Sequence, residues 1–253
     1  MIFLSTLPGV RAVKNLRVLF MGEMQRLQRY HIIAASLVVA VIWIGVLHFT
    51  DVDDVTSIFP LLLFLDATSM SITLIGVSMF FEREEHTLKA LFVSPITKGE
   101  YMISKIIGNI VSNLQTLVIL YLYAWFFKEI NLNIFLLVFY VIVISVFHSM
   151  IGFLLAYRSK SFTELLTGVL KYMFIFLIPV VLEQVGVITG DLLTNLMYAL
   201  PTKAALLLLN STTNGVETWE ILYGIAYLIG LSLLLSVVIR KGFEEFVAKE
   251  SGI

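Results

Sequence analysis

Long apolar runs alternate with short polar segments along most of this chain. Six runs, at 31–49, 58–80, 101–127, 132–157, 165–182 and 221–239, are close to or above the length of about 20 residues that a helix needs to cross a bilayer. Because hydrocarbon offers no hydrogen-bond partners to an open backbone, each run is expected to be an α-helix. The pattern predicts an all-α polytopic membrane protein with six transmembrane helices.

Two further apolar segments do not fit the length or the continuity of a span. In 10–30, basic residues oppose an apolar stripe at helical spacing, which is typical of an amphipathic helix lying in the membrane surface. The stripe consists of Val13, Leu16, Leu19, Phe20, Met24 and Leu27. The segment 183–215 is interrupted by Gly186, Gly190 and Pro201, so short re-entrant or interfacial outer helices are expected there before the last span.

Composition and charge support this topology. Hydrophobic residues make up 59% of the chain and charged residues 14%, against about 25% charged residues in ordinary globular domains. All basic residues except Lys128 and Lys203 fall in the terminal segments or near alternate junctions between the runs. By the positive-inside rule these segments, including both termini, are expected to be cytoplasmic. The net charge of −1 favours membrane lipid over nucleic acid as a partner.

Motifs that carry chemistry are missing from the sequence. It contains no G-x-x-x-x-G-K-[ST] phosphate loop, no H-E-x-x-H zinc pair, no G-x-S-x-G elbow and no cysteine. We therefore expect no catalytic residue, no bound metal and no cofactor on this chain. If it takes part in driven transport, ATP and Mg must bind to another polypeptide.

The most highly charged segment, 82–99, lies between the second and third runs. Acidic residues at its start favour the first turn of a short helix. Leu88, Leu91 and Phe92 would give this helix one apolar face, and Pro95 would end it. Thr97 and Glu100 then have the spacing of a capping box, at which the next helix would begin. The segment is predicted to be a short cytoplasmic helix whose apolar face needs a partner.

The sequence FEREEHTLKALFVSPITKGEYMISKII, which begins at Phe81, resembles the pattern after the second span of ABC-2-type transporter permeases. These proteins are the membrane subunits of one class of ATP-driven exporter. His86 and Lys89 depart from the family pattern, and the short loop after the first run resembles the compact drug, antibiotic or bacteriocin exporters. The matching residues are Glu82, Arg83, Glu84, Thr87, Leu88, Leu91, Ser94, Pro95, Glu100, Tyr101 and Lys105.

The resemblance implies a multi-pass subunit of a prokaryotic plasma membrane. It would work with a separate ABC ATPase (nucleotide-binding) subunit and with a second permease copy or a homologous permease. The segment 82–99 would be the coupling region between permease and ATPase. The residues implied in ATPase-subunit coupling are Glu82, Arg83, Glu84, Glu85, Thr87, Leu88, Leu91, Phe92, Ser94 and Pro95.

Polar residues inside the second run have two interpretations. Asp66 is an intramembrane carboxylate, a residue type that usually faces a protein interior or a cavity. Together with Thr68, Ser69 and Thr73 it could line a substrate path. Alternatively, these residues form interhelical hydrogen bonds that fix the packing. Lys171, near the start of the fifth run, could likewise line a path or extend its amine to the membrane surface.

Two other classes of function were weighed against the exporter. The Glu84–Glu85 pair is similar to the paired glutamates of CAAX-type intramembrane proteases. That chemistry needs the pair within a membrane helix and histidines on neighbouring helices to activate a water, whereas here the pair falls in a predicted loop. A passive channel or a sensor scaffold would leave the apolar residues of the loop unexplained.

Overall fold

The computed structural model describes residues 8–85, 87, 96–213 and 215–251, with side chains for 15–85, 87, 96–213 and 215–242. In these ranges the chain is helical apart from short connections and one isolated β-bridge between Asp54 and Glu129. The long helices are α1 (Pro8–Arg29), α2 (Ile32–Phe49), α3 (Phe59–Glu84), α5 (Lys98–Phe127), α6 (Ile134–Arg158) and α11 (Thr218–Ser251). The shorter elements are α7 (Phe162–Tyr172), η2 (Met173–Leu177), α8 (Ile178–Gln184), α9 (Asp191–Met197), α10 (Pro201–Asn210) and η3 (Ser211–Thr213).

Six helical stretches among the described residues are long and apolar enough to cross a membrane. Five are α2, α3, α5, α6 and the first part of α11, and the sixth joins α7, η2 and α8 as Phe162–Gln184. The predicted fold class, an all-α polytopic membrane protein, is therefore confirmed. The sixth stretch contains a π-helical segment, η2, directly before Pro179. A proline lacks the amide that would continue the ladder, so the wider turn absorbs a local break without ending the helix.

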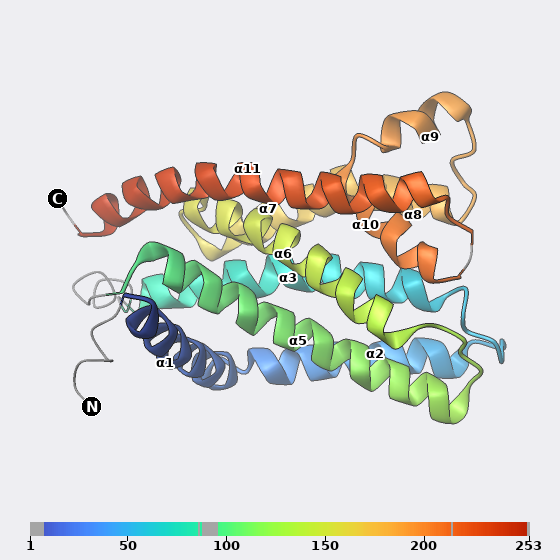
Figure 1. Ribbon diagram of the computed structural model, residues 1–253, viewed down its shortest axis with the longest axis horizontal. Helices are drawn as coiled ribbons and strands as arrows, with labels where there is room; N and C mark the ends of the chain where they lie inside the picture. Colours follow the sequence, from blue (N-terminus) through green and yellow to red (C-terminus); the bar gives the residue numbers. More distant parts are fainter. Residues whose placement is uncertain (1–7, 86, 88–95, 214, 252–253) are drawn as a thin grey trace.

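Helices α3 and α6 form the centre of the bundle (Figure 1). In the most apolar 18-residue stretch of each helix, 67% of α3 and 50% of α6 is buried inside the bundle, against 22% of α2 and 17% of α11. The two central helices approach closely at Gly152 of α6, where an added Cβ would lie 2.8 Å from the backbone oxygen of Ile72. A small residue at this crossing lets two membrane helices pack backbone to backbone.

Interhelical hydrogen bonds cross this centre and join α3, α5 and α6. Asn113 Nδ2 donates to Ser71 Oγ at 2.7 Å and to Ser145 Oγ at 2.8 Å. One turn earlier on α5, Asn109 Nδ2 donates to Ser149 Oγ at 2.7 Å. All five side chains are buried. Such bonds stabilise helix association where there is no hydrophobic driving force between helices in lipid.

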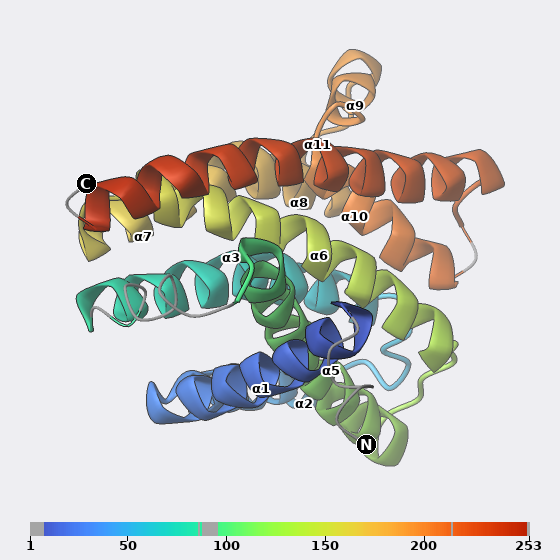
Figure 2. The ribbon, with the colours of Figure 1, turned by 60° about the vertical axis from the view of Figure 1, so that its left-hand side comes forward.

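The segment before the last helix forms two short helices that meet at a sharp bend. The bend between α9 and the α10–η3 unit is 95°. Helix α9 stands away from the bundle in Figure 1 and Figure 2, whereas α10 packs between α3, α6 and α11. Residues 204–209 of α10 are all buried.

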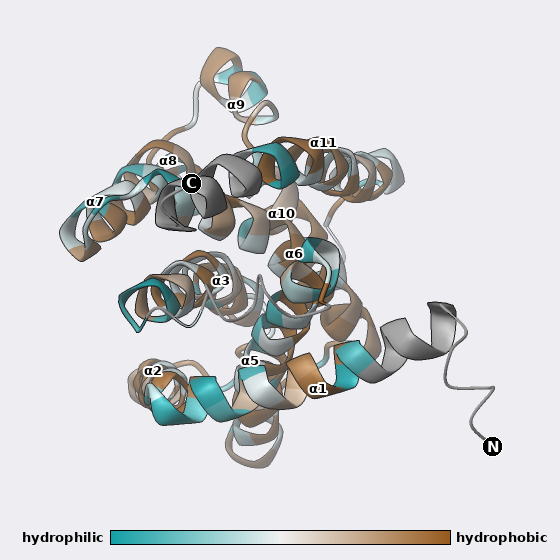
Figure 3. Cartoon of the chain, turned by 90° about the vertical axis from the view of Figure 1, so that its left-hand side faces the viewer, coloured by the Kyte–Doolittle hydropathy of each residue, from teal (hydrophilic) through white to brown (hydrophobic). Residues whose placement is uncertain are grey.

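Helix α1 lies across α5 and is linked to α2 by a tight turn. His31 takes a left-handed conformation, with φ 57°, at the turn where the chain passes from α1 into α2. Leu19, Glu23 and Leu27 face α5 and are buried. The predicted apolar stripe is thus used partly for contact with the protein and not only with lipid. Figure 3 shows hydrophilic residues gathered along α1 and at the helix ends beside it.

Candidate functional site

The charged motif spans the end of α3 and the start of α5. Glu82 and Glu84 lie in the last turn of α3, and Glu85 is its C-cap residue. The expectation that these acidic residues open a new helix is wrong, because α3 continues past residue 80. Negative charges at a helix C-terminus are unfavourable with the helix dipole, so they need compensating cations. The predicted capping box is confirmed: Glu100 N donates to Thr97 Oγ1 at 3.2 Å, and Thr97 N donates to Glu100 Oε2 at 2.7 Å.

Part of the predicted coupling region falls outside the described residues. Leu88, Leu91, Phe92, Ser94 and Pro95 are in this group, and a helix with an apolar face at these positions stays a prediction.

The described residues of the predicted coupling region have different surroundings. Arg83 donates to the backbone oxygens of Ser159 at 2.6 Å and Lys160 at 3.2 Å, which ties the end of α3 to the α6–α7 turn. Thr87 Oγ1 donates to the backbone oxygen of Glu82 at 3.1 Å. Glu84 and Glu85 are exposed. Glu82 is instead completely buried, so its carboxylate does not reach the surface in this conformation.

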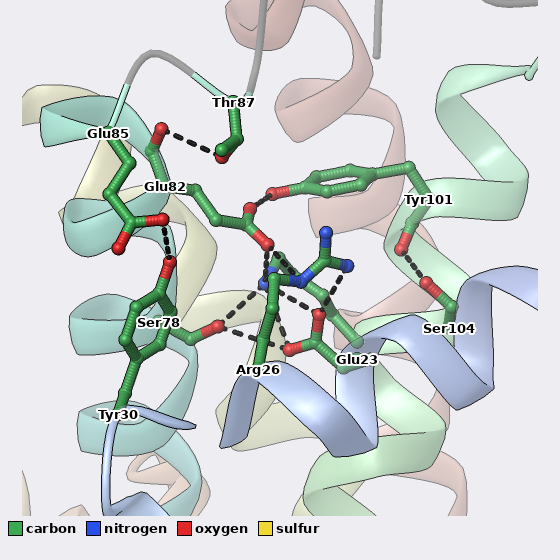
Figure 4. A network of polar contacts seen from close by, with 10 residues as sticks. Glu23, Arg26, Tyr30, Ser78, Glu82, Glu85, Thr87, Tyr101 and Ser104 are labelled. Atoms are coloured by element: carbon green, nitrogen blue, oxygen red, sulfur yellow. Dashed lines mark hydrogen bonds and ion pairs between the residues drawn. The ribbon is translucent and has the colours of Figure 1, made fainter. Parts of the chain in front are cut away.

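Glu82 belongs to a group of polar side chains from three helices, shown in Figure 4. We call this group the buried ionic cluster: Glu23 and Arg26 of α1, Ser78 and Glu82 of α3, and Tyr101 and Lys105 of α5. It lies at the end of the bundle where α3 finishes and α5 begins.

Lys105 is the central cation of the cluster. Its Nζ lies 3.0 Å from Glu23 Oε1, 3.1 Å from Glu82 Oε1 and 2.7 Å from Ser78 Oγ. None of the surface of its side chain is exposed, although a lysine side chain is long enough to carry its amine out of a protein interior. The lysine therefore joins α5 to α1 and α3 at once.

Arg26 is the second cation and Tyr101 adds a neutral donor. Arg26 Nε lies 2.9 Å from Glu82 Oε1, and Arg26 Nη2 lies 2.9 Å from Glu23 Oε2. Tyr101 OH donates to Glu82 Oε2 at 2.5 Å. Each carboxylate thus has both cations and one hydroxyl group as partners, with Ser78 beside Glu23 and Tyr101 beside Glu82. Two negative and two positive charges balance within the cluster.

Electrostatics keep Glu23 and Arg26 charged despite their burial. Burial raises the pKa of Glu23, but the charges of Lys105 and Arg26 outweigh it and hold that pKa below its usual value. Burial lowers the pKa of Arg26, and the carboxylates of Glu82 and Glu23 raise it above its usual value. Charged groups removed from water are tolerated only when they are paired in this way.

The sequence motif contains Glu82, Tyr101 and Lys105 but does not predict this cluster, because Glu23 and Arg26 lie outside the motif. The available signals were a lysine inside a predicted span and an acid on an otherwise basic amphipathic helix. Neither signal identifies the partner, because Glu23 and Lys105 are 82 positions apart.

The polar residues of the second run make hydrogen bonds within the chain. Asp66 is 3% exposed and accepts a hydrogen bond from Trp43 Nε1 at 3.1 Å, which links α3 to α2. Thr68 Oγ1 donates to the oxygen of Phe64 at 2.6 Å, and Thr73 Oγ1 donates to that of Ser69 at 2.8 Å. The Asp66–Trp43 contact favours the packing interpretation for Asp66, whereas the two threonine bonds lie within α3. A substrate path along these residues stays a prediction. Lys171 is exposed.

The geometry of a metal or protease site is not found in the part of the chain that the structure describes. No group of three or more His, Asp or Glu side chains there could hold a metal ion. Glu84 and Glu85 lie at the end of α3 and not in mid-membrane, and Glu85 Oε2 accepts a hydrogen bond from Tyr30 OH at 2.8 Å. The arrangement does not favour the intramembrane protease.

Comparison with known proteins gives a consistent result. The model of the "Fluoroquinolones export permease protein family" matches residues 13–251. Two curated relatives, the fluoroquinolones export permease proteins of Mycobacterium tuberculosis strains CDC 1551 / Oshkosh and ATCC 25618 / H37Rv, are each 23% identical over 227 residues. The alignment covers 89% of this chain and 93% of each relative. The resemblance to ABC-2-type permeases is thus confirmed, and the chain belongs to the fluoroquinolones export permease protein family as a multi-pass membrane permease of a transporter.

Proposed function

We propose that this chain is the transmembrane subunit of an ATP-driven exporter of drugs of the fluoroquinolone class. Membership of the family over residues 13–251, on a bundle of six membrane-length helices, is the observation that carries the proposal. The names of the two relatives supply the substrate class. These drugs are planar aromatic molecules, and a chain whose helices expose mostly apolar side chains suits such an amphiphilic cargo.

The energy source in this proposal is a separate ATPase subunit. The sequence has no phosphate-binding loop of its own, so ATP and Mg would bind to that partner. A second permease, either a copy of this chain or a homologue, would complete the pathway, since closed two-fold assemblies are the commonest solution for such subunits. Both termini and the α3–α5 connection would face the cytoplasm of a prokaryotic cell, where the ATPase is located.

The proposed docking site is the connection between α3 and α5. The exposed Glu84 and Glu85 stand at its start, and the capping box at Thr97 rigidly fixes its end. Arg83, in the last turn of α3, anchors the start of the connection to the α6–α7 turn. A force applied to this connection therefore acts on helix ends that are held firmly, which is what a transmission of rigid-body motion requires.

The test is export into inverted membrane vesicles that contain the chain and the ATPase subunit expected to be encoded beside it. We expect ATP-dependent uptake of a fluorescent fluoroquinolone into the vesicles and co-purification of the two subunits. Leu88→Asp with Leu91→Asp should abolish co-purification, whereas Leu88→Met with Leu91→Met should preserve it. Drug movement that is independent of ATP would instead support a passive channel and overturn the proposal.

A further inference from the structure

Helix α1 is attached to both helices that flank the proposed docking site. To the end of α3 it is joined by Arg26–Glu82 at 2.9 Å and by Tyr30–Glu85 at 2.8 Å. Arg29 adds a longer contact to Glu85 at 3.8 Å. These contacts lie within the last turn and the cap of α3.

Contacts with the start of α5 are equally direct. Glu23 binds Lys105 at 3.0 Å, and Asn15 Nδ2 donates to Glu100 Oε1 of the capping box at 3.3 Å. Further along, α1 packs on Gly108, where an added Cβ would lie 3.1 Å from Glu23 Cγ. One helix thus follows α5 over more than two turns while it holds α3.

A buried ionic contact resists sliding in a way that an apolar contact does not. Two leucine surfaces can shift by an ångström at little cost, because dispersion is not directional. If Lys105 separated from Glu23, each would lose one of its two oppositely charged partners at a buried position, which is unfavourable. Glu82 is shared by Lys105 and Arg26, so neither cation can leave without unbalancing the other contact.

We propose that the buried ionic cluster locks α1, the end of α3 and the start of α5 into one moving unit, and that Glu23 and Lys105 are positioning residues for drug export. This inference rests on the proposed function. A displacement of the helix ends beside the docking site carries α1 along the membrane surface with them. The amphipathic helix is then a component of the transport cycle as well as a lipid contact.

Burial of charge is weak evidence for stability, because apolar residues of similar size often replace a buried pair without loss. This allows the mechanical role to be separated from folding. Glu23→Met with Lys105→Met removes the α1–α5 pair and leaves Arg26 paired with Glu82. We expect this variant to fold, to assemble with the ATPase and to hydrolyse ATP. Drug exported per ATP hydrolysed should fall at least about fivefold, in line with the usual size of coupling between sites.

The matched control is the ion pair at the other end of the bundle. Lys203 Nζ lies 2.6 Å from Glu183 Oε1, and the two side chains are 12% and 11% exposed. Glu183→Met with Lys203→Met should leave the ratio of export to ATP hydrolysis unchanged. If Glu23→Met with Lys105→Met also leaves that ratio unchanged, the cluster only supports the fold and the inference is wrong.

A second measurement covers the case in which the double variant does not assemble. The chain has no native cysteine, so introduced pairs can be bridged selectively by a short bis-maleimide. Bridging Asn15→Cys to Glu100→Cys fixes α1 to the start of α5, and the same variant without the bridge is the reference. A single moving unit keeps export within about twofold of the unbridged protein. Loss of export on bridging would show that α1 moves independently. Failure of the proposed function is distinct from both results, since the unmodified complex would then show no ATP-dependent export.

Discussion

The amine of Lys105 lies 3.0 Å from the carboxylate of Glu23, although the two residues are 82 positions apart in the chain and neither is exposed to solvent. This contact places a surface helix and a membrane-length helix in one ionic network. It also means that a single substitution in the pair should destabilise the protein more than the double substitution does.

Replacement of Lys105 alone by Met should destabilise the protein by about 3 kcal/mol or more, because Glu23 and Glu82 would then share only Arg26. Replacement of Glu23 and Lys105 together by Met should restore stability to within about 1 kcal/mol of the native chain. Thermal unfolding of the detergent-solubilised protein measures both. A double variant that is less stable than Lys105→Met would show that the two residues do not act as a pair.

Stability should fall in acid because of Glu23. Its pKa is lowered in the folded protein from an ordinary value of 4.5, so its ionised form stabilises the fold above pH 4.5, and this contribution is lost as the pH falls below that value. The groups that face it are Arg26, Lys105, Ser78 and, through Glu82, Tyr101. Apparent melting temperatures between pH 3.5 and 7 give the measurement. Glu23→Gln should flatten the acid limb, whereas Glu84→Gln, at an exposed position, should leave it unchanged.

The crossing of α3 and α6 should not tolerate a side chain at Gly152. An added Cβ would lie 2.8 Å from the oxygen of Ile72 and 2.9 Å from Ile75 Cβ, so the helices must separate. Gly152→Ala is expected to destabilise the protein by about 1–3 kcal/mol. At Gly45 no atom lies within 4 Å of an added Cβ, and Gly45→Ala should be neutral or slightly stabilising. Equal melting temperatures for the two variants would contradict the close approach.

Asp66 offers a test of packing against a substrate path. An asparagine there keeps an oxygen that can accept from Trp43 Nε1, so Asp66→Asn should preserve both stability and drug export. Asp66→Ala leaves a buried indole N–H without a partner and should cost about 1–3 kcal/mol. Export and thermal unfolding of the two variants are compared. Loss of export in stable Asp66→Asn would show that the negative charge itself serves the pathway.

The sequence predicts the spanning helices well, because their length and apolarity follow from the bilayer and do not depend on neighbours. The capping box at Thr97 was also predictable, since it involves residues three positions apart. In contrast, α3 extends past residue 80, and Arg26 and Lys105 neutralise Glu82 at its end. Those cations come from other helices, so local reasoning placed the acidic residues in a separate helix.

The same distinction applies to the candidate site. The motif predicted a coupling role for residues at the end of α3 and before α5, but not that Glu82 is buried while Glu84 is exposed. The side on which a residue lies in this turn depends on how α1 crosses α5. The pattern of apolar residues within α1 or within α5 does not predict how the two helices cross.

The left-handed turn at His31 leaves almost no slack between the first two helices. Only Tyr30 and His31 separate α1 from α2, and two residues span about 7 Å at most. A lateral shift of α1 beyond that reach must therefore pull the near end of α2, a helix that is mostly uncovered by the rest of the bundle. A shift of α1 along the membrane surface would therefore be passed through the turn at His31 to α2, which would tilt in the bilayer.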